Sequence, residues 1–299
     1  MEHITVLLNE SVEALNIKDG GIYVDATLGG GGHSELILKQ LKKGHLYAFD
    51  QDPYAHQRAG ERLKDYPNKT FIHANFQKMK EELNKLGIFK VDGILFDLGL
   101  SSFQIDDETR GFSYLKDYKL DMRMDTTKDF SAHTVVNTYS QQELADVFRK
   151  YGDEVNAWKI AGEIVKQRPL ETTFDIVRIT DRINRNVKGH SAKRVFQALR
   201  IEVNKELDVL SDVLEDTLEL LNPGGRLVVI TFHSLEDRIT KQFMKKNSTL
   251  DVPKNVDIRN LPKPPLVMIN RKAILPSEEE LEYNKRSHSA QLRIAERQW

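Results

Sequence analysis

The segment from Ile22 to Ser34 constrains the fold of this chain more than any other. A short run of β-favouring residues ends at Asp25, four consecutive glycines follow at 29–32, and an amphipathic helix is predicted to begin near Ser34. Glycine suits such a turn because it adopts positive φ readily and because a Cβ would hold the backbone away from a ligand. The order of strand, glycine turn and helix therefore predicts an α/β fold with a nucleotide-type cofactor site.

A second acidic residue indicates a cofactor that carries positive charge. Asp50 ends the next apolar run, roughly twenty residues after Gly31, which is the spacing at which a carboxylate receives ribose hydroxyls. The turn departs from the dinucleotide pattern G-x-G-x-x-G because Ser34 stands at the last glycine, and Asp25 would repel a pyrophosphate. A cationic amino-acid group next to adenosine suits both acids, so we expect S-adenosylmethionine. The alternative is a glycine-rich turn without a ligand.

Apolar runs separated by turn residues predict a sheet with helices on both faces. Asp52 followed by Pro53 predicts the start of one helix, and Gly87 predicts the end of another that has a buried apolar stripe. Repeated strand–helix–strand units favour parallel strands. The expected strands lie at 22–24, 46–49, 70–74, 91–96, 226–231, 267–269 and 291–295, and the stripe consists of Phe76, Met79, Leu83 and Leu86.

The alternation stops in the middle of the chain, where helical patterns dominate. Ser140 with Glu143 matches a capping box, and apolar residues at helical spacing follow it. Apolar residues at steps of three or four from Val195 to Leu221 predict one long helix that leads back to the sheet. We therefore expect a domain formed by residues 1–112 and 201–299, interrupted by a helical insertion at 113–200.

The composition excludes several classes of site. The 299 residues include no cysteine, so disulfides, thiolate metal sites and cysteine nucleophiles are excluded. No residue cluster has the usual metal-ligand spacing, and we expect no metal. The net charge of -1 means that any nucleic-acid contact needs a local basic patch. The longest aliphatic runs span about four residues against the ~20 that cross a bilayer, and no basic region precedes the first apolar residues, so we expect a cytoplasmic protein without a signal peptide or membrane partner.

Several long and unusual strings resemble one bacterial family, the enzymes that methylate N4 of a cytosine in 16S ribosomal RNA. The similarity runs from residue 3 to about residue 296. The strings are His3-Ile-Thr-Val-Leu-Leu-Asn-Glu10, Asp97-Leu-Gly-Leu-Ser-Ser102, Arg110-Gly-Phe-Ser113, Leu120-Asp-Met-Arg-Met-Asp125, Arg194-Val-Phe-Gln-Ala-Leu-Arg200, Phe232-His-Ser-Leu-Glu-Asp-Arg238 and Ser289-Ala-Gln-Leu-Arg-Ile-Ala-Glu296.

The resemblance implies a fold, a cofactor and a substrate. The fold would be the class I, Rossmann-like, seven-stranded methyltransferase sheet, and the cofactor S-adenosylmethionine. The substrate would be a cytosine of the decoding region, reached in the small ribosomal subunit rather than in short free RNA, with no DNA partner. The implied cofactor contacts are Gly31, Gly32, His33, Asp50, Phe76, Asp97 and Gln104.

The chemistry of an exocyclic amine suggests where catalysis takes place. Methylation of pyrimidine C5 usually uses a cysteine adduct, which this chain cannot supply, whereas an amine needs acceptors that orient its lone pair. Ser102 and Phe103 follow one predicted strand and His233 follows another, so these three are the catalytic candidates, although His233 also suits a structural role. Phe103 and Ser191 stand where the family pattern has proline, and residue 103 lies next to the implied pocket for the target base.

A cluster of basic residues marks the predicted RNA contact. Between residues 182 and 200 the chain carries six arginines and lysines and no acid. Lys193, Arg194 and Arg200 are the candidates for phosphate contacts, since positive charge without acids is the usual signature of such a surface. The alternative is a solvated helical face.

Three other functions are consistent with parts of the pattern. A nicotinamide-dependent oxidoreductase would share the glycine turn, but the imperfect pattern and Asp25 argue against it. DNA methyltransferases that act on cytosine N4 or adenine N6 usually carry a Pro-Pro-Tyr or Pro-Pro-Trp string after the fourth strand, where this chain has Ser-Ser-Phe-Gln. A non-catalytic RNA-binding factor on the same frame would have the same binding residues.

Overall fold

The computed structural model describes residues 4–101, 104–105, 107, 109–250 and 263–299. The chain forms two compact units, one made of Met1–Gly99 with Leu207–Trp299 and the other of Leu100–Glu206. The sequence placed the corresponding boundaries after residues 112 and 200. They lie elsewhere because both flanking segments bond within the helical unit: Met122 N donates to Arg110 O at 2.9 Å, and Met124 N donates to Asn204 Oδ1 at 2.8 Å.

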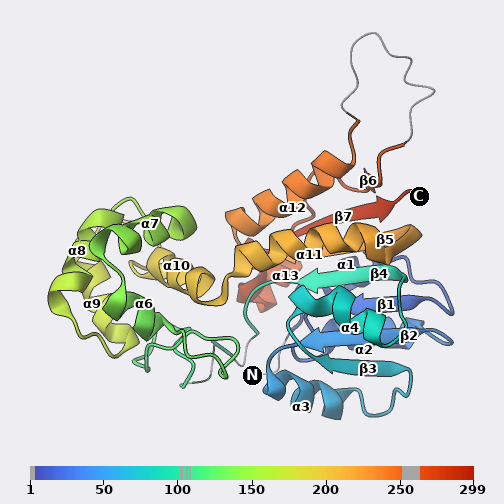
Figure 1. Cartoon of the computed structure of the whole chain (residues 1–299), viewed down its shortest axis with the longest axis horizontal. Helices are drawn as coiled ribbons and strands as arrows, with labels where there is room; N and C mark the ends of the chain where they lie inside the picture. The colour runs from blue at the N-terminus through green and yellow to red at the C-terminus, as the bar shows by residue number, and fades with distance from the viewer. Residues whose placement is uncertain (1–3, 102–103, 106, 108, 251–262) are drawn as a thin grey trace, which may run out of the picture. The chain divides into compact units, whose positions relative to one another are not determined.

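Seven strands form one mixed sheet in the order β3-β2-β1-β4-β5-β7-β6 (Figure 1). Neighbours from β3 to β5 run parallel, and β7 runs antiparallel to both β5 and β6. All seven expected strands are present. They are β1 Ile22–Asp25, β2 His45–Asp50, β3 Lys69–His73, β4 Val91–Asp97, β5 Leu221–Thr231, β6 Leu266–Met268 and β7 Gln291–Arg297.

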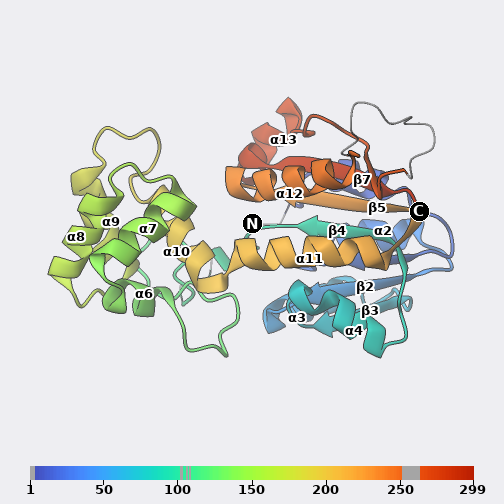
Figure 2. The same cartoon turned by 45° about the horizontal axis from the view of Figure 1, so that its top comes forward.

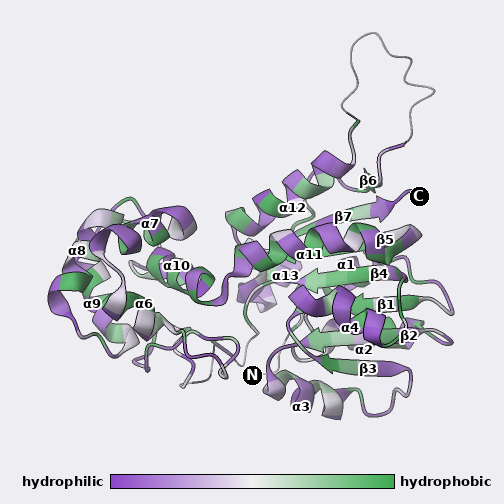
Figure 3. Ribbon diagram, viewed as in Figure 1, coloured by the Kyte–Doolittle hydropathy of each residue, from purple (hydrophilic) through white to green (hydrophobic). Residues whose placement is uncertain are grey.

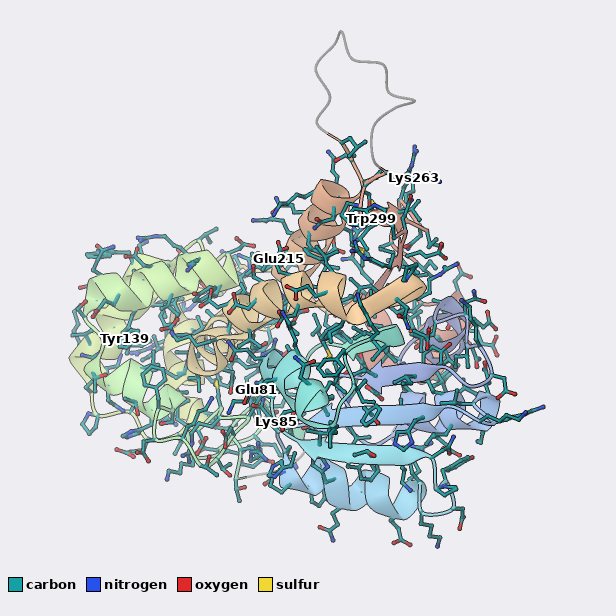
Figure 4. The ribbon with its side chains drawn as sticks, turned by 45° about the vertical axis from the view of Figure 1, so that its right-hand side comes forward. Glu81, Lys85, Tyr139, Glu215, Lys263 and Trp299 are labelled. Carbon is teal, nitrogen blue, oxygen red and sulfur yellow. The ribbon has the colours of Figure 1, made fainter. Side chains whose placement is uncertain are left out.

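One face of the sheet is covered by α4 (Met79–Lys85), α11 (Glu206–Leu220) and α12 (Ser234–Asn247), as Figure 2 shows. These helices are amphipathic, and Figure 3 shows hydrophobic and hydrophilic residues alternating along α11 and α12. Leu83 and Met244 are fully buried against the strands. Exposed residues of the same helices form ion pairs, such as Lys85 with Glu81 at 2.7 Å (Figure 4).

The opposite face is covered by α1 (Leu8–Ala14), α2 (Gly32–Gln40) and α3 (Pro53–Arg62). The predicted start of α3 is confirmed, because the Asp52 side chain accepts a hydrogen bond from Tyr54 N at 3.0 Å and Pro53 occupies the first turn. Burial of apolar residues on both faces gives a three-layer α/β/α arrangement. The carboxyl ends of the parallel strands are thereby held in fixed register.

Two of the expected helices differ from the structure, one at both of its ends and the other by a break in its middle. The stripe that began at Phe76 is a 3-10 turn, Phe76–Lys78, followed by α4, and Leu86 is 51% exposed because it lies beyond the last turn, next to Gly87 with a φ of 77°. The long helix is two helices, α10 (Lys193–Asn204) and α11, because Lys205 adopts a left-handed φ of 53°.

The helical unit consists of α6 (Ala132–Thr138), α7 (Gln141–Gly152), α8 (Ala157–Gln167), α9 (Thr173–Ile183) and α10. The predicted capping box is confirmed: the Ser140 hydroxyl accepts from Glu143 N at 3.3 Å, and Glu143 Oε2 accepts from Ser140 N at 2.7 Å. Tyr139, labelled in Figure 4, donates its hydroxyl to Glu202 Oε1 at 2.7 Å.

Candidate active site

The strand order changes direction between β1 and β4, and this switch point is where open α/β sheets bind ligands. The carboxyl ends of β1, β2 and β4 carry Asp25, Asp50 and Asp97. The register places Asp25 opposite Ala48 on β2 and Leu95 on β4, so the three strands end at nearly the same level. Three carboxyl groups therefore gather at one edge of the sheet.

Asp25 is fully buried at the end of β1. The Ser34 hydroxyl donates to its Oδ2 at 2.6 Å, and Thr27 N donates to its Oδ1 at 3.1 Å. Burial, together with the charge of Asp50, raises the pKa of Asp25 to about 6 against the lowering effect of these hydrogen bonds. Ser34 lies in the first turn of α2, so Asp25 also ties this helix to the strand.

Asp50 shapes the glycine turn from the end of β2. Gly29 N donates to its Oδ2 at 2.9 Å, and Asp52 N donates to its Oδ1 at 2.9 Å. Burial raises the pKa of this carboxyl, although the two backbone donors oppose the rise. Each oxygen retains lone pairs, so the carboxylate can accept further hydrogen bonds from a ligand.

Asp97 has a buried oxygen, Oδ1, with no hydrogen-bond partner in the described part of the chain. Its other oxygen lies 3.6 Å from His33 Nδ1, and His33 Nε2 lies 3.1 Å from Val6 O. Burial raises the pKa of Asp97 well above its ordinary value, and the charges of Asp25 and Glu236 add to the shift. A buried polar atom without a partner is costly, so this oxygen is a candidate for a ligand contact.

The glycine turn requires glycine for two reasons, the backbone conformation at Gly29 and Gly31 and the lack of space at Gly32. Gly29 and Gly31 have φ of 50° and 77°, a conformation that glycine adopts without strain. A Cβ on Gly32 would lie 1.9 Å from Thr5 Oγ1, so the segment before α1 packs directly on the start of α2. The expectation that this turn needs glycine is confirmed at these three positions.

Phe76 lies just after β3, at the same end of the sheet as the acidic cluster. Its ring packs edge-on against Phe96 of β4, with centroids 5.5 Å apart. Asn75 caps this turn through its side chain, which accepts from Gln77 N at 2.8 Å. Phe76 is only partly buried, so part of its ring remains exposed.

The structure brings together most of the residues that the sequence assigned to the cofactor. Gly31, Gly32, His33, Asp50, Phe76 and Asp97 all lie in the sheet unit near the carboxyl ends of β1 to β4. Gln104 belongs to the helical unit, where it is buried and its Oε1 accepts from Ser101 N at 3.1 Å. Ser102 and Phe103 lie outside the described residues.

His233 is the N-cap residue of α12. Its Nδ1 accepts from Glu236 N at 3.4 Å, and its Nε2 lies 3.0 Å from Glu236 Oε1. Glu236 also accepts from Phe232 N at 2.8 Å. This geometry corresponds to the structural role that the sequence left open, and a catalytic role for His233 stays a prediction.

The three predicted RNA contacts differ in their surroundings. Lys193 is exposed, and Arg194 is half-buried and donates to Asp153 O at 3.2 Å. Arg200 forms a two-pronged ion pair with Glu206, with distances of 2.8 and 2.7 Å. The guanidinium of Arg200 is therefore engaged within the helical unit.

Sequence reasoning missed the residues that hold the acids in place. Thr27 Oγ1 accepts from Asp97 N at 2.7 Å, and Val6 O lies within hydrogen-bond distance of His33 Nε2, at 3.1 Å. Glu236 is buried with only 3% of its surface exposed, and its charge acts on Asp97. Its spacing of three residues after His233 is that of a capping box, and this signal was available in the sequence.

The acidic cluster fits a cationic ligand. No lysine or arginine from the described ranges of the chain pairs with Asp25, Asp50 or Asp97. Burial is the main cause that raises their pKa values, and the charge of Asp50 adds to the rise at Asp25 as the charge of Asp25 does at Asp97. A cation placed among them would favour their charged forms and give the free oxygen of Asp97 a partner. S-adenosylmethionine carries a sulfonium and an ammonium group, so its charge and its adenosine match the acids and the aromatic ring of Phe76.

Comparisons with known proteins identify the family. The model of the MraW methylase family matches residues 1–298. The chain is 70% identical to ribosomal RNA small subunit methyltransferase H 1 of Acholeplasma laidlawii, over 100% of both chains, and 52% identical to ribosomal RNA small subunit methyltransferase H of Onion yellows phytoplasma, over 98% of this chain and 96% of the relative. A solved rRNA methylase from Streptococcus thermophilus aligns over 100% of both chains with a TM-score of 0.46 at 14% identity. The chain belongs to the MraW methylase family and is a methyltransferase that uses S-adenosylmethionine.

Proposed function

We propose that this enzyme methylates the exocyclic N4 amine of a cytosine in the decoding region of 16S rRNA, within the small ribosomal subunit. The relatives are named as methyltransferases of the small-subunit ribosomal RNA, which supports the class of substrate. The sequence strings that resemble the cytosine-N4 methyltransferases support cytosine as the base. The lack of cysteine supports an amine rather than C5 as the acceptor, because the usual C5 route needs a cysteine adduct.

The observation that carries the proposal is the cluster of Asp25, Asp50 and Asp97 without a cationic partner among the described residues. When bound there, S-adenosylmethionine supplies a methyl group on a positively charged sulfur. Asp50 would receive the ribose hydroxyls, and the backbone of Gly31 and Gly32 would face the amino-acid end. The remaining contacts in the proposal are His33, Phe76, Asp97 and Gln104.

The amine must be oriented before it can react. Its lone pair is delocalised into the cytosine ring, so hydrogen-bond acceptors have to hold the amine in the reactive geometry. Ser102, Phe103 and His233 are the proposed groups for holding the amine and stacking the base. Such orientation is worth about 7–11 kcal/mol of a barrier. A strong base is unnecessary, since the proton leaves readily once the nitrogen has become positive.

The target base must also be accessible. A paired cytosine uses its amine in a hydrogen bond, so the base has to be unpaired or extruded. Lys193 and Arg194 of the helical unit are the proposed phosphate contacts. Arg200 is a weaker candidate because Glu206 already binds its guanidinium. Replacing Lys193 and Arg194 with Glu is expected to weaken binding to small subunits and to flatten its salt dependence.

Because the proposed substrate is the small ribosomal subunit, we assign the enzyme to the cytoplasm. In the described part of the chain, no helix has the length and apolar character to cross a bilayer. Neither DNA nor a metal ion has a role in the proposal.

The proposal is tested by incubating the purified protein with radiolabelled S-adenosylmethionine and purified small subunits, then mapping the labelled nucleotide. We expect one labelled cytosine in the decoding region, with the label on N4. Duplex DNA and short free RNA serve as controls and should remain unlabelled. Label on another atom would refute the proposal, as would binding to the subunit without any transfer.

A further inference from the structure

Three rings form a ladder in the helical unit. Phe196 on α10 is buried, and the ring of Tyr114 meets it edge-on with centroids 5.6 Å apart. The ring of His190 lies next, 4.4 Å from Tyr114 at an interplanar angle of 32°. Tyr114 and His190 are both half-buried. The ladder therefore begins in the core of the unit and ends at its surface.

The last ring of the ladder is held in a fixed orientation. Ala192 N donates to His190 Nδ1 at 3.2 Å, so the neutral ring carries its proton on Nε2. Lys193 N donates to His190 O at 3.1 Å. The loop that carries His190 is anchored by the buried side chain of Asn184, whose Nδ2 donates to Ser191 O at 2.9 Å. A ring held in this way loses little conformational entropy when a second ring stacks on it.

Positive charge surrounds the end of the ladder. Arg185, Lys188 and Lys193 are exposed and form no ion pair with any residue that the structure describes. Two acids bond to neutral groups of this region rather than to these cations: Glu154 accepts from Asn184 Nδ2 at 3.0 Å, and Asp181 accepts from the Ser191 hydroxyl. Rings next to unpaired cations are the combination that binds single-stranded nucleic acid.

We propose that the ladder Phe196–Tyr114–His190 and its flanking cations form a stacking site for an unpaired nucleotide of single-stranded RNA. His190 receives the base, and Lys188 and Lys193 contact the adjacent phosphates. The proposal rests on the proposed function and deepens it, because it assigns to the helical unit a contact with an unpaired base in addition to phosphate contacts.

The test compares two substitutions of His190 in the full-length protein. Both His190→Ala and His190→Phe remove the hydrogen bond from Ala192 N, but only His190→Phe keeps a ring. The probe is a fluorescein-labelled ten-nucleotide oligocytidylate, with binding followed by anisotropy. Since stacking is worth ~1–3 kcal/mol per base, His190→Ala is expected to weaken binding by about 5- to 150-fold, whereas His190→Phe should stay within about threefold of the parent.

A charge variant tests the phosphate contacts. Lys188→Gln is expected to reduce the slope of log K against log salt by about 0.7, the value for one phosphate of a single strand. A duplex of the same length is expected to bind without sensitivity to His190→Ala. Circular dichroism of each variant shows whether the helices remain folded.

Several outcomes would overturn the stacking site. They are parental affinity in His190→Ala, an equal loss in His190→Phe, and binding of polyglutamate with the same dependence on His190. The proposed function fails separately. If the parent labels no subunit cytosine but His190 still governs oligonucleotide binding, the stacking site stands alone. If methylation occurs normally in a His190→Ala variant that also binds the oligonucleotide normally, only the stacking site is wrong.

Discussion

At the scale of single residues, Asp25 links the acidic site to the stability of the free enzyme. Folding raises the pKa of this fully buried carboxyl from 3.8 to about 6, so the folded state binds its proton more tightly than the unfolded state. The contribution of Asp25 to stability therefore falls as pH rises from about 4 to about 6, by roughly 3 kcal/mol, and stays constant above that range.

The comparison that checks this is urea unfolding of the parent and Asp25→Asn at pH 4, 5, 6 and 7. Asparagine does not ionise, so the variant should gain stability relative to the parent as pH rises through this window. Using the difference between the two proteins cancels the other titrating groups that they share. Parallel stability curves would show that Asp25 does not change its protonation as expected.

Gly32 illustrates a steric constraint between distant parts of the sequence. Gly32→Ala is expected to destabilise the protein by about 1–3 kcal/mol, because its Cβ would lie 1.9 Å from Thr5 Oγ1. Thr5→Ala removes that oxygen and should recover part of the loss in the double variant. The measurement is a double-mutant cycle in the free energy of unfolding. Simple additivity would mean that the two residues do not clash.

Asp50 combines a structural role with the proposed ribose contact. Asp50→Ala is expected to weaken binding of S-adenosylmethionine by about 1.5–3 kcal/mol, the value of a hydrogen bond to a charged group. Asp50→Asn is the matched control, because it preserves size and one acceptor for Gly29 N, and it should lose less. Calorimetric titration gives both affinities. Unchanged affinity in Asp50→Ala would remove the ribose assignment.

At the scale of elements, the break between α10 and α11 shows where apolar periodicity misled the prediction. The stripe continues across residue 205, but Lys205 has a φ of 53° there. Asn204 ends α10, where its Nδ2 donates both to Arg200 O of the same helix at 2.9 Å and to Met122 O at 2.8 Å. Periodicity reports which residues are buried, and it does not show a change of backbone direction between two buried segments.

This left-handed residue gives a prediction about helix stability. Both Lys205→Gly and Lys205→Ala lose the ion pair of Lys205 with Glu202 at 2.8 Å, but only glycine adopts this conformation without strain. Lys205→Gly is therefore expected to be more stable than Lys205→Ala by up to about 1 kcal/mol. Thermal unfolding of both variants checks the pair. A less stable Lys205→Gly, as helix propensity alone would give, would indicate a continuous helix.

At the scale of the whole molecule, the acidic cluster of Asp25, Asp50 and Asp97 lies within one of two compact units. We expect bound S-adenosylmethionine to slow hydrogen exchange mainly at 22–34 and 45–52, where the amides surround the acidic cluster. At a hundred times the dissociation constant the stabilisation is about 2.7 kcal/mol, so amides that exchange by opening of the site should slow about 100-fold. Exchange in α7, α8 and α9 should change little, and equal slowing across both units would contradict the expected location.

The sequence by itself determined the order of strands and helices, the glycine turn and most of the residues around the acidic cluster. These follow from local signals, because apolar spacing, caps and glycine depend on neighbouring residues. Only the tertiary structure decided that Asp97 keeps an unpartnered oxygen, that Thr5 restricts Gly32 and that Glu206 engages Arg200. The first two depend on contacts between segments far apart in the chain, and local spacing carries no information about which of them meet. The pair of Arg200 with Glu206 forms across the left-handed turn at Lys205, which the apolar spacing does not reveal.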